Sequence, residues 1–211
     1  MLEPDRAGDA PDSALHVQPL PPMTDRDFAR ARDIVFADSG VQLTAQKREL
    51  VTARLSRRIR NLGLTGFRQY LELVASDRRE RVEMLDRILT NETRFFREPR
   101  QFEVIRQTLV PVWRAAAESG RRQRTLRAWS AGCSTGQEPV SLAMVLLDAL
   151  PDWHIEVLAS DLSTRALRAA MRGEWPLEKA GEIPVPLRRE FMLRGVRTRE
   201  GVMRATTASC P

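Results

Sequence analysis

Apolar residues recur at helical spacing through the first part of the chain and predict four helices between residues 24 and 90. Thr24, with Asp27 three residues later, is a helix-start signature, and Ser39-Gly40 is a stop signal. A second helix opens at Thr44. The stripes predict a small helical domain with a shared core, and their members are Phe28, Ala31 and Val35; Leu50, Val51, Leu55, Ile59 and Leu62; Phe67, Tyr70, Leu71 and Val74; and Val82, Leu85, Ile88 and Leu89.

The pattern changes after residue 90. Residues 91–98 interrupt the helical spacing, and Pro99 suits the first turn of a further helix with an apolar face formed by Phe102, Ile105 and Leu109. A basic run at 121–124 then leads into the next element. We therefore expect residues 91–119 to be linker helices between two domains.

Two short apolar stretches in the remaining chain predict strands, each followed by a helix. Residues 125–130 form the first strand, and residues 154–160 have the composition of a buried parallel strand. The first strand is followed by a helix with the apolar stripe Leu142, Val145, Leu146 and Ala149, and the second by a helix that starts from a cap at Ser163.

From Gly173 onward prolines indicate loops, and residues 196–205 suggest a hairpin. The whole order predicts an α/β fold in which a Rossmann-like domain over 120–211 follows a helical domain over 24–90.

The composition indicates a folded protein. Of the 211 residues, 42% are hydrophobic, which supports a packed core. No apolar run approaches the roughly 18 residues of a membrane span, so we expect a cytoplasmic protein without membrane insertion. Residues 1–23 contain five prolines and predict a disordered leader. Cys133 and Cys210 lie in a loop and at the chain end, so we expect a reducing compartment and no disulfide.

Positive charge is concentrated in the helical domain. The segment from Thr44 to Arg81 has ten cations and four anions, so its net charge of +6 equals that of the whole chain. Two interpretations remain open: a solvated helix face, or a docking surface for an acidic partner. Nucleic-acid binding is a weaker alternative, because the segment has few aromatic residues for stacking. The residues of the expected docking face are Lys47, Arg54, Arg57 and Arg58.

The loop between the first strand and its helix, residues 131–136, is the main candidate for chemistry. It contains little side-chain bulk and leads to a helix N-terminus, where free N–H groups gather. A phosphate-binding P-loop does not fit, because Gly132 and Gly136 are too close and no Lys follows. A hydrolase nucleophile elbow fits the spacing around Ser134, but the only later histidine, His154, is poorly placed. The third interpretation is an S-adenosylmethionine site, in which Asp161 would bind the ribose diol.

Three blocks of sequence carry a resemblance to the CheR-type chemotaxis receptor methyltransferases, which use S-adenosylmethionine to methylate receptor glutamates. The blocks are 91–98 (NETRFFRE), 129–139 (WSAGCSTGQEP) and 159–164 (ASDLST). Residues 43–63 also resemble the family's basic helix. The resemblance implies a protein-glutamate O-methyltransferase with chemoreceptor cytoplasmic helices as partners, S-adenosylmethionine as cofactor, and neither a metal nor a nucleic acid.

The resemblance also implies roles for individual residues. Asn91, Thr93 and Arg97 would line the cofactor and active site, with Arg97 in the catalytic role. Gly132 and Glu138 would hold the methionine end of the cofactor, and Asp161 the ribose hydroxyls. Simpler roles remain open: an interface ion pair for Arg97, a helix cap for Thr93, and a dipole-complementing acid for Glu138.

The resemblance weakens at residues 206–211, while the family's domain continues through several more strands. We therefore expect an incomplete methyltransferase domain, whether as a fragment, a frameshifted product or a natural truncation. Such a chain is expected to have weak activity, and a non-catalytic receptor-docking module remains the alternative function.

Overall fold

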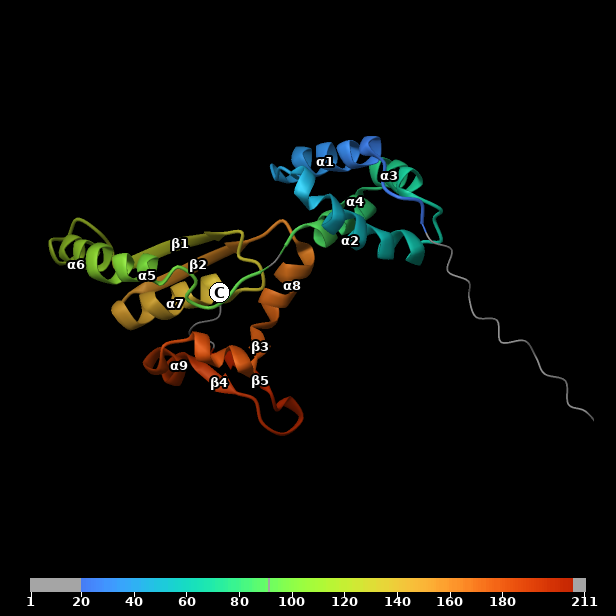
Figure 1. Cartoon of the computed structure of the whole chain (residues 1–211). Helices are drawn as coiled ribbons and strands as arrows, with labels where there is room; N and C mark the ends of the chain where they lie inside the picture. The colour runs from blue at the N-terminus through green and yellow to red at the C-terminus, as the bar shows by residue number, and fades with distance from the viewer. Residues whose placement is uncertain (1–19, 91, 207–211) are drawn as a thin grey trace, which may run out of the picture.

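The structure, a computed structural model, describes residues 20–90 and 92–206. Figure 1 shows a helical bundle, α1 to α4, beside a part built on a small parallel sheet. Residues 1–19 of the expected leader lie outside the described residues. Part of the described end of this segment is packed, contrary to that prediction: Leu20 lies against the bundle core, Met23 is buried in it, and the Met23 carbonyl accepts a bond of 2.6 Å from Arg48 Nη2.

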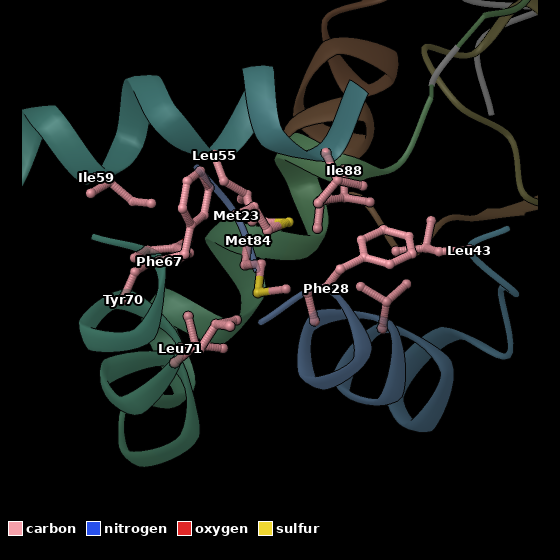
Figure 2. Packing of buried hydrophobic residues seen from close by; sticks show 14 of the residues in the cluster. Met23, Phe28, Leu43, Leu55, Ile59, Phe67, Tyr70, Leu71, Met84 and Ile88 are labelled. Carbon is pink, nitrogen blue, oxygen red and sulfur yellow. The ribbon is translucent and has the colours of Figure 1, made fainter. Parts of the chain in front are cut away.

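The bundle is formed by α1 (Asp25–Ser39), α2 (Arg48–Asn61), α3 (Phe67–Ser76) and α4 (Arg78–Ile88), with a 3₁₀ turn, Ala45–Lys47, before α2. Thr24 and Asp27 form the expected capping box, and Gly40 ends α1 in the left-handed region. Most of the predicted apolar stripes meet in one core (Figure 2), although Val82 is only half-buried and the adjacent core position belongs to Met84.

A second group of helices precedes the sheet: α5 (Pro99–Val104), a π-helical segment (Ile105–Leu109) and α6 (Val110–Glu118). Phe102 is buried as expected, but Leu109 is 38% exposed and Val110 is buried in its place. The π-helical turn explains this correction, because its wider spacing rotates the following residues relative to the α-helical stripe.

The parallel sheet pairs β1 (Thr125–Ala131) with β2 (His154–Ser160) in register from Thr125↔His154 to Ala131↔Ser160. Helix α7 (Gln137–Ala149) connects the strands, and α8 (Thr164–Arg172) follows β2 from a Ser163 cap. The prediction that β2 is buried is wrong: no residue of it is buried, and Leu158 is 63% exposed. Exposed residues alternate along β2, so one face of the strand is uncovered, and among the described residues β2 pairs only with β1.

The last part is a second sheet with the order β3-β5-β4, formed by β3 (Glu174–Pro176), β4 (Met192–Arg194) and β5 (Val202–Ala205). Helix α9 (Val185–Phe191) precedes β4. The predicted hairpin is present as β4 and β5, but its first strand begins at residue 192 and not at residue 196. The α9 helix was missed, because Pro186, taken as a loop signal, lies in its first turn, where proline is tolerated. Within the described ranges, no helix is both long and apolar enough to cross a membrane.

Candidate functional site

A cavity of about 710 Å³ lies between the helical bundle and the carboxyl ends of β1 and β2. This volume is within the range of small-molecule sites, and the edge of the sheet is where ligands bind in α/β folds. Both parts of the molecule supply its lining, which includes Val41, Gln42, Leu43, Lys47, Leu50, Ile88, Leu89 and Thr90 from the bundle side and Thr93, Arg97, Phe102, Gly132, Ser134, Glu138, Ser160, Asp161 and Leu162 from the other.

The loop between β1 and α7 is held tightly against the end of β2. The backbone N–H groups of Gly132 and Cys133 both donate to the Ser160 carbonyl, at 2.8 and 2.9 Å. Gly136 has φ +93°, and a Cβ there would meet Ala170 at 3.1 Å and the Trp175 ring at 3.3 Å. A left-handed glycine is therefore required at this position, for both conformation and space.

Glu138 lies in the first turn of α7 and lines the cavity. Its Oε1 accepts a hydrogen bond of 2.6 Å from the Ser130 hydroxyl at the end of β1. Ser130 is buried, so the bond fixes the direction of an otherwise exposed carboxylate. The carboxylate keeps further acceptor positions for a ligand.

Asp161 follows β2 directly and also lines the cavity. Its Oδ2 accepts from the Ser134 N–H at 2.7 Å, and its Oδ1 accepts from the Ser163 N–H at 2.8 Å. Each carboxylate oxygen can accept about two hydrogen bonds. Asp161 is therefore oriented by the protein while retaining acceptor positions that suit a vicinal diol.

The stretch from Glu92 to Arg97 reaches the cavity through Glu92, Thr93 and Arg97. Asn91, predicted to join them, lies outside the described residues. The stretch is anchored by Phe95, whose N–H donates to Glu182 Oε2 at 2.8 Å and whose ring contacts Trp175 edge-on at 5.2 Å. Among the described residues, the exposed Arg97 donates a single long bond of 3.3 Å, to the Glu92 carbonyl, which leaves most of its donors available to a ligand.

The predicted docking cations do not share one exposed face. Arg58 forms two bonds to Glu80, at 2.9 and 2.6 Å, and Arg54 donates to the Ile88 carbonyl at 2.6 Å. Both side chains therefore turn toward α4, a contact that helical spacing alone does not reveal. Arg57 and Lys47 are exposed, and Lys47 lines the cavity.

Glu80 is buried and also accepts a bond of 3.0 Å from the Tyr70 hydroxyl. Burial, followed by the nearby Glu80 charge, raises the pKa of Tyr70 far above its usual value. The hydrogen bond that Arg58 donates to the Glu80 carboxylate raises the pKa of Arg58. Arg58, Tyr70 and Glu80 thus link α2, α3 and α4 through hydrogen bonds.

The nucleophile elbow is not assembled. His154 is at the opposite end of β2 from Asp161, roughly 20 Å from the Ser134 loop at about 3.3 Å per strand residue. It is exposed and contacts Glu156 at 3.1 Å. The thiol of Cys133, the residue before Ser134, is buried. Burial and the Asp161 charge raise the pKa of this thiol, so Cys133 is not an activated nucleophile either.

Comparison with known proteins identifies the domain that carries this cavity. Residues 91–210 match the family described as "CheR methyltransferase, SAM binding domain", and residues 26–89 match "CheR methyltransferase, all-alpha domain". The chain belongs to the CheR methyltransferase family. The resemblance found in the sequence is thereby confirmed, as is the fold class: an all-α domain followed by an α/β domain that binds S-adenosylmethionine.

Individual relatives agree with this assignment. The chain is 43% identical over 162 residues to a probable chemotaxis protein methyltransferase of Rhizobium etli, covering 74% of the chain and 59% of the relative. It is 36% identical to chemotaxis protein methyltransferase 2 of Pseudomonas aeruginosa (86% of the chain, 63% of the relative) and 36% identical to the chemotaxis protein methyltransferase of Escherichia coli (86% and 62%). The chain therefore spans about three-fifths of the length of these relatives.

The cofactor of this domain is S-adenosylmethionine, and the lining of the cavity fits it. The ligand carries a sulfonium cation, an amino-acid end and a ribose diol. Oriented carboxylates at Glu138 and Asp161 suit the ammonium group and the diol, and Arg97 offers a fork for a carboxylate. The described residues contain no group of three or more His, Cys, Asp and Glu that could hold a metal ion.

Sequence reasoning named most of these residues but missed their supports. Ser130 lies inside a quoted block, and its role in holding Glu138 depends on an eight-residue separation that closes only when the strand, loop and helix form. Ser134 was considered as a nucleophile, whereas it contacts Asp161 through its backbone N–H. No side-chain pattern signals a backbone donor.

Proposed function

We propose that this chain transfers the methyl group of S-adenosylmethionine to glutamate carboxylates on the cytoplasmic helices of chemoreceptors, forming methyl esters. The observation that carries the proposal is that Glu138 and Asp161 of the cofactor-binding domain line the same cavity as Lys47 of the basic helical domain. Glu138 and Asp161 would hold the cofactor at the sheet edge, and the bundle side of the cavity, with Lys47, would receive an acidic receptor helix.

The residues around the cavity have distinct proposed tasks. Asp161 binds the ribose hydroxyls, Glu138 the ammonium group of the methionine end, and Gly132 lets that end approach the backbone. Arg97, with Asn91 and Thr93, lines the active site, and its guanidinium is the group proposed to touch the reacting carboxylate. S-adenosylmethionine supplies an electrophilic methyl group when bound.

The proposed reaction needs no general base. A glutamate has an unperturbed pKa of about 4.3, so the acceptor is already ionised near neutrality. The protein's contribution is to hold the acceptor oxygen in line with the methyl group and to exclude water. Lys47 and Arg97, the two cations of the lining, favour an anionic acceptor at this position.

The division of labour follows the domains. We propose that residues 24–90 dock the receptor, that 91–119 connect the domains and carry part of the active site, and that 120–211 bind the cofactor. Arg57 and Lys47 are the exposed cations for an acidic receptor surface, while Arg54 and Arg58 act there indirectly by holding α2 against α4.

A methyl-transfer assay tests the proposal. The chain would be incubated with receptor-containing membranes and S-adenosylmethionine labelled in the methyl group, alongside Arg97→Ala and the surface control Arg100→Ala. We expect base-labile label on receptor glutamates, lost with Arg97→Ala and kept with Arg100→Ala. Receptor binding without any label would favour a non-catalytic docking module instead.

A further inference from the structure

Asp86 of α4 is buried, and its carboxylate and its backbone carbonyl contact Thr164 and Arg165 of the cofactor-binding domain. Its Oδ2 accepts from the Thr164 hydroxyl at 2.8 Å, and its Oδ1 lies 3.4 Å from the Arg165 backbone N–H that points toward it. The Asp86 carbonyl accepts a bond of 3.1 Å from Arg165 Nη2. A side chain of the bundle is thus bonded to the start of α8, a helix that lies beside the bundle in Figure 1.

These contacts complete the N-terminus of α8. The first N–H groups of a helix have no partner within it, and a carboxylate near them is favoured by the helix dipole. Ser163 is the N-cap of α8, and its Oγ accepts a hydrogen bond of 3.1 Å from the Ala166 N–H. Asp86 accepts from the preceding N–H, that of Arg165. The first turn of α8 is therefore capped jointly by its own serine and by a carboxylate from the other domain.

The capped turn adjoins the proposed ribose-binding residue. Ser163 donates its N–H to Asp161 Oδ1 at 2.8 Å, so the position of the α8 turn determines where that carboxylate oxygen lies. Ile88 and Leu89, at the end of α4, line the cavity opposite Asp161 and Leu162. Asp86 therefore bridges the two walls of the cavity just behind its lining.

We propose that Asp86 is a positioning residue, which acts through the start of α8 to hold Asp161 and the width of the cofactor cavity. The inference deepens the proposed function and depends on its assignment of the ribose diol to Asp161. Loss of the Asp86 carboxylate should leave the bundle folded, release the α8 turn and reduce cofactor affinity about tenfold, as expected of a residue that couples to a site without touching the ligand.

Asp86→Asn tests this with a matched control, Asp38→Asn. Asp38 also accepts two bonds from an arginine, Arg81, but both residues belong to the bundle and neither lines the cavity. Binding of S-adenosylmethionine to the 211-residue chain would be measured by calorimetry, together with the thermal unfolding midpoint. We expect weaker binding with Asp86→Asn and unchanged binding with Asp38→Asn. Equal affinities in the two variants would overturn the inference.

A double substitution separates positioning from general destabilisation. If Asp86 acts through Asp161, adding Asp86→Asn to Asp161→Ala should lower affinity no further than Asp161→Ala alone. Additive losses would show that Asp86 acts elsewhere and would overturn the proposal. If Asp161→Ala alone binds as the unsubstituted chain does, the cofactor assignment fails instead.

Amide hydrogen exchange gives a readout that does not require the cofactor. Asp86→Asn should raise exchange at the Ser134, Ser163 and Arg165 amides, which depend on this network, while Asp38→Asn should not. Unchanged protection of these amides in Asp86→Asn would contradict the positioning role whatever the binding data show.

Discussion

The backbone N–H of Ser134 donates to Asp161 Oδ2 at 2.7 Å and so joins the loops that follow β1 and β2. The same loops are joined by the bonds from Gly132 and Cys133 to the Ser160 carbonyl. Asp161 is therefore oriented before any ligand arrives. A pre-oriented carboxylate has little conformational freedom left to lose on binding, which favours affinity.

Replacing Glu138 by Gln should reduce cofactor affinity by about 1.5–3 kcal/mol, the range for a hydrogen bond to a charged group. Ser130→Ala should cost less, about 1 kcal/mol, because it removes only the bond that orients the carboxylate. Calorimetric titration with S-adenosylmethionine measures both. If Glu138→Gln lowered the unfolding midpoint but not affinity, Glu138 would serve only the α7 dipole.

Tyr70 makes stability sensitive to high pH. Its pKa in the folded protein is raised far above the ordinary value of 10.0, chiefly by burial. The unfolded chain therefore loses the phenol proton at a lower pH than the folded protein does. The contribution of Tyr70 to the free energy of unfolding is complete below about pH 10 and decreases as the pH rises further.

Urea titrations at increasing pH would measure this decline, and Tyr70→Phe should reduce it. Tyr70 is the only tyrosine of the chain, so phenolate absorbance reports on it alone. Phenolate absorbance should rise only as the protein unfolds. A rise near pH 10 in the folded protein would rule out the buried Tyr70–Glu80 contact.

Arg57→Glu and Arg58→Glu should separate docking from stability. Arg58→Glu leaves the buried Glu80 without its cation and adds a like charge, so it should cost about 3 kcal/mol of unfolding free energy, at the low end for buried pairs because the Arg58 side chain is 25% exposed. Arg57→Glu should change stability by no more than about 0.5 kcal/mol. Chemical denaturation of both variants measures the difference.

The exposed cations Arg57 and Lys47 are expected to govern receptor association. Arg57→Glu, and likewise Lys47→Glu, should slow association with receptor membranes and weaken its dependence on salt, because rim charges act mainly on the encounter rate. Surface plasmon resonance at several salt concentrations would detect this. An unchanged rate at low salt for both variants would indicate a basic face that is merely solvated.

Gly136→Ala should destabilise the chain by about 1–3 kcal/mol, because alanine at φ +93° is strained and its Cβ would press on Ala170 and Trp175. Gly63→Ala is the matched control: its φ is +67° and nothing lies within 4 Å of the added Cβ. Thermal unfolding of the two variants isolates the packing contribution. If Gly136→Ala lowered the stability no more than Gly63→Ala does, a packing contribution at Gly136 would be excluded.

Local signals in the sequence predicted most elements. The Thr24 capping box and the Ser163 cap require only residues within one turn, and both helices begin where these signals place them. The strand-loop-helix around Gly132 was predicted from equally local spacing. In these elements the neighbours in sequence determine the conformation, and the prediction was right. The π-helical turn at Ile105–Leu109 and the proline in the first turn of α9 are also local features, but helical spacing and the usual loop signal of proline did not predict them.

Other errors arose where contacts distant in sequence decide the outcome. Arg58 was assigned to an open face because helical spacing does not reveal Glu80, 22 residues away, as its partner. The role of Asp86 was not predicted, because its partners, Thr164 and Arg165, are nearly 80 residues away in the sequence. Burial of β2 was overestimated because apolar composition does not specify which elements cover each face of a sheet.

The most direct test of the account is the affinity of the chain for S-adenosylmethionine with and without Asp161. Calorimetry should show one site per chain, weakened by about 1.5–3 kcal/mol, or roughly ten- to 150-fold, in Asp161→Ala. Asp152→Ala, which removes an exposed partner of Arg124 near the opposite end of β2, should bind as the unsubstituted chain does. An Asp161→Ala variant with unchanged affinity would contradict the central claim that the cavity between the two domains is the cofactor site.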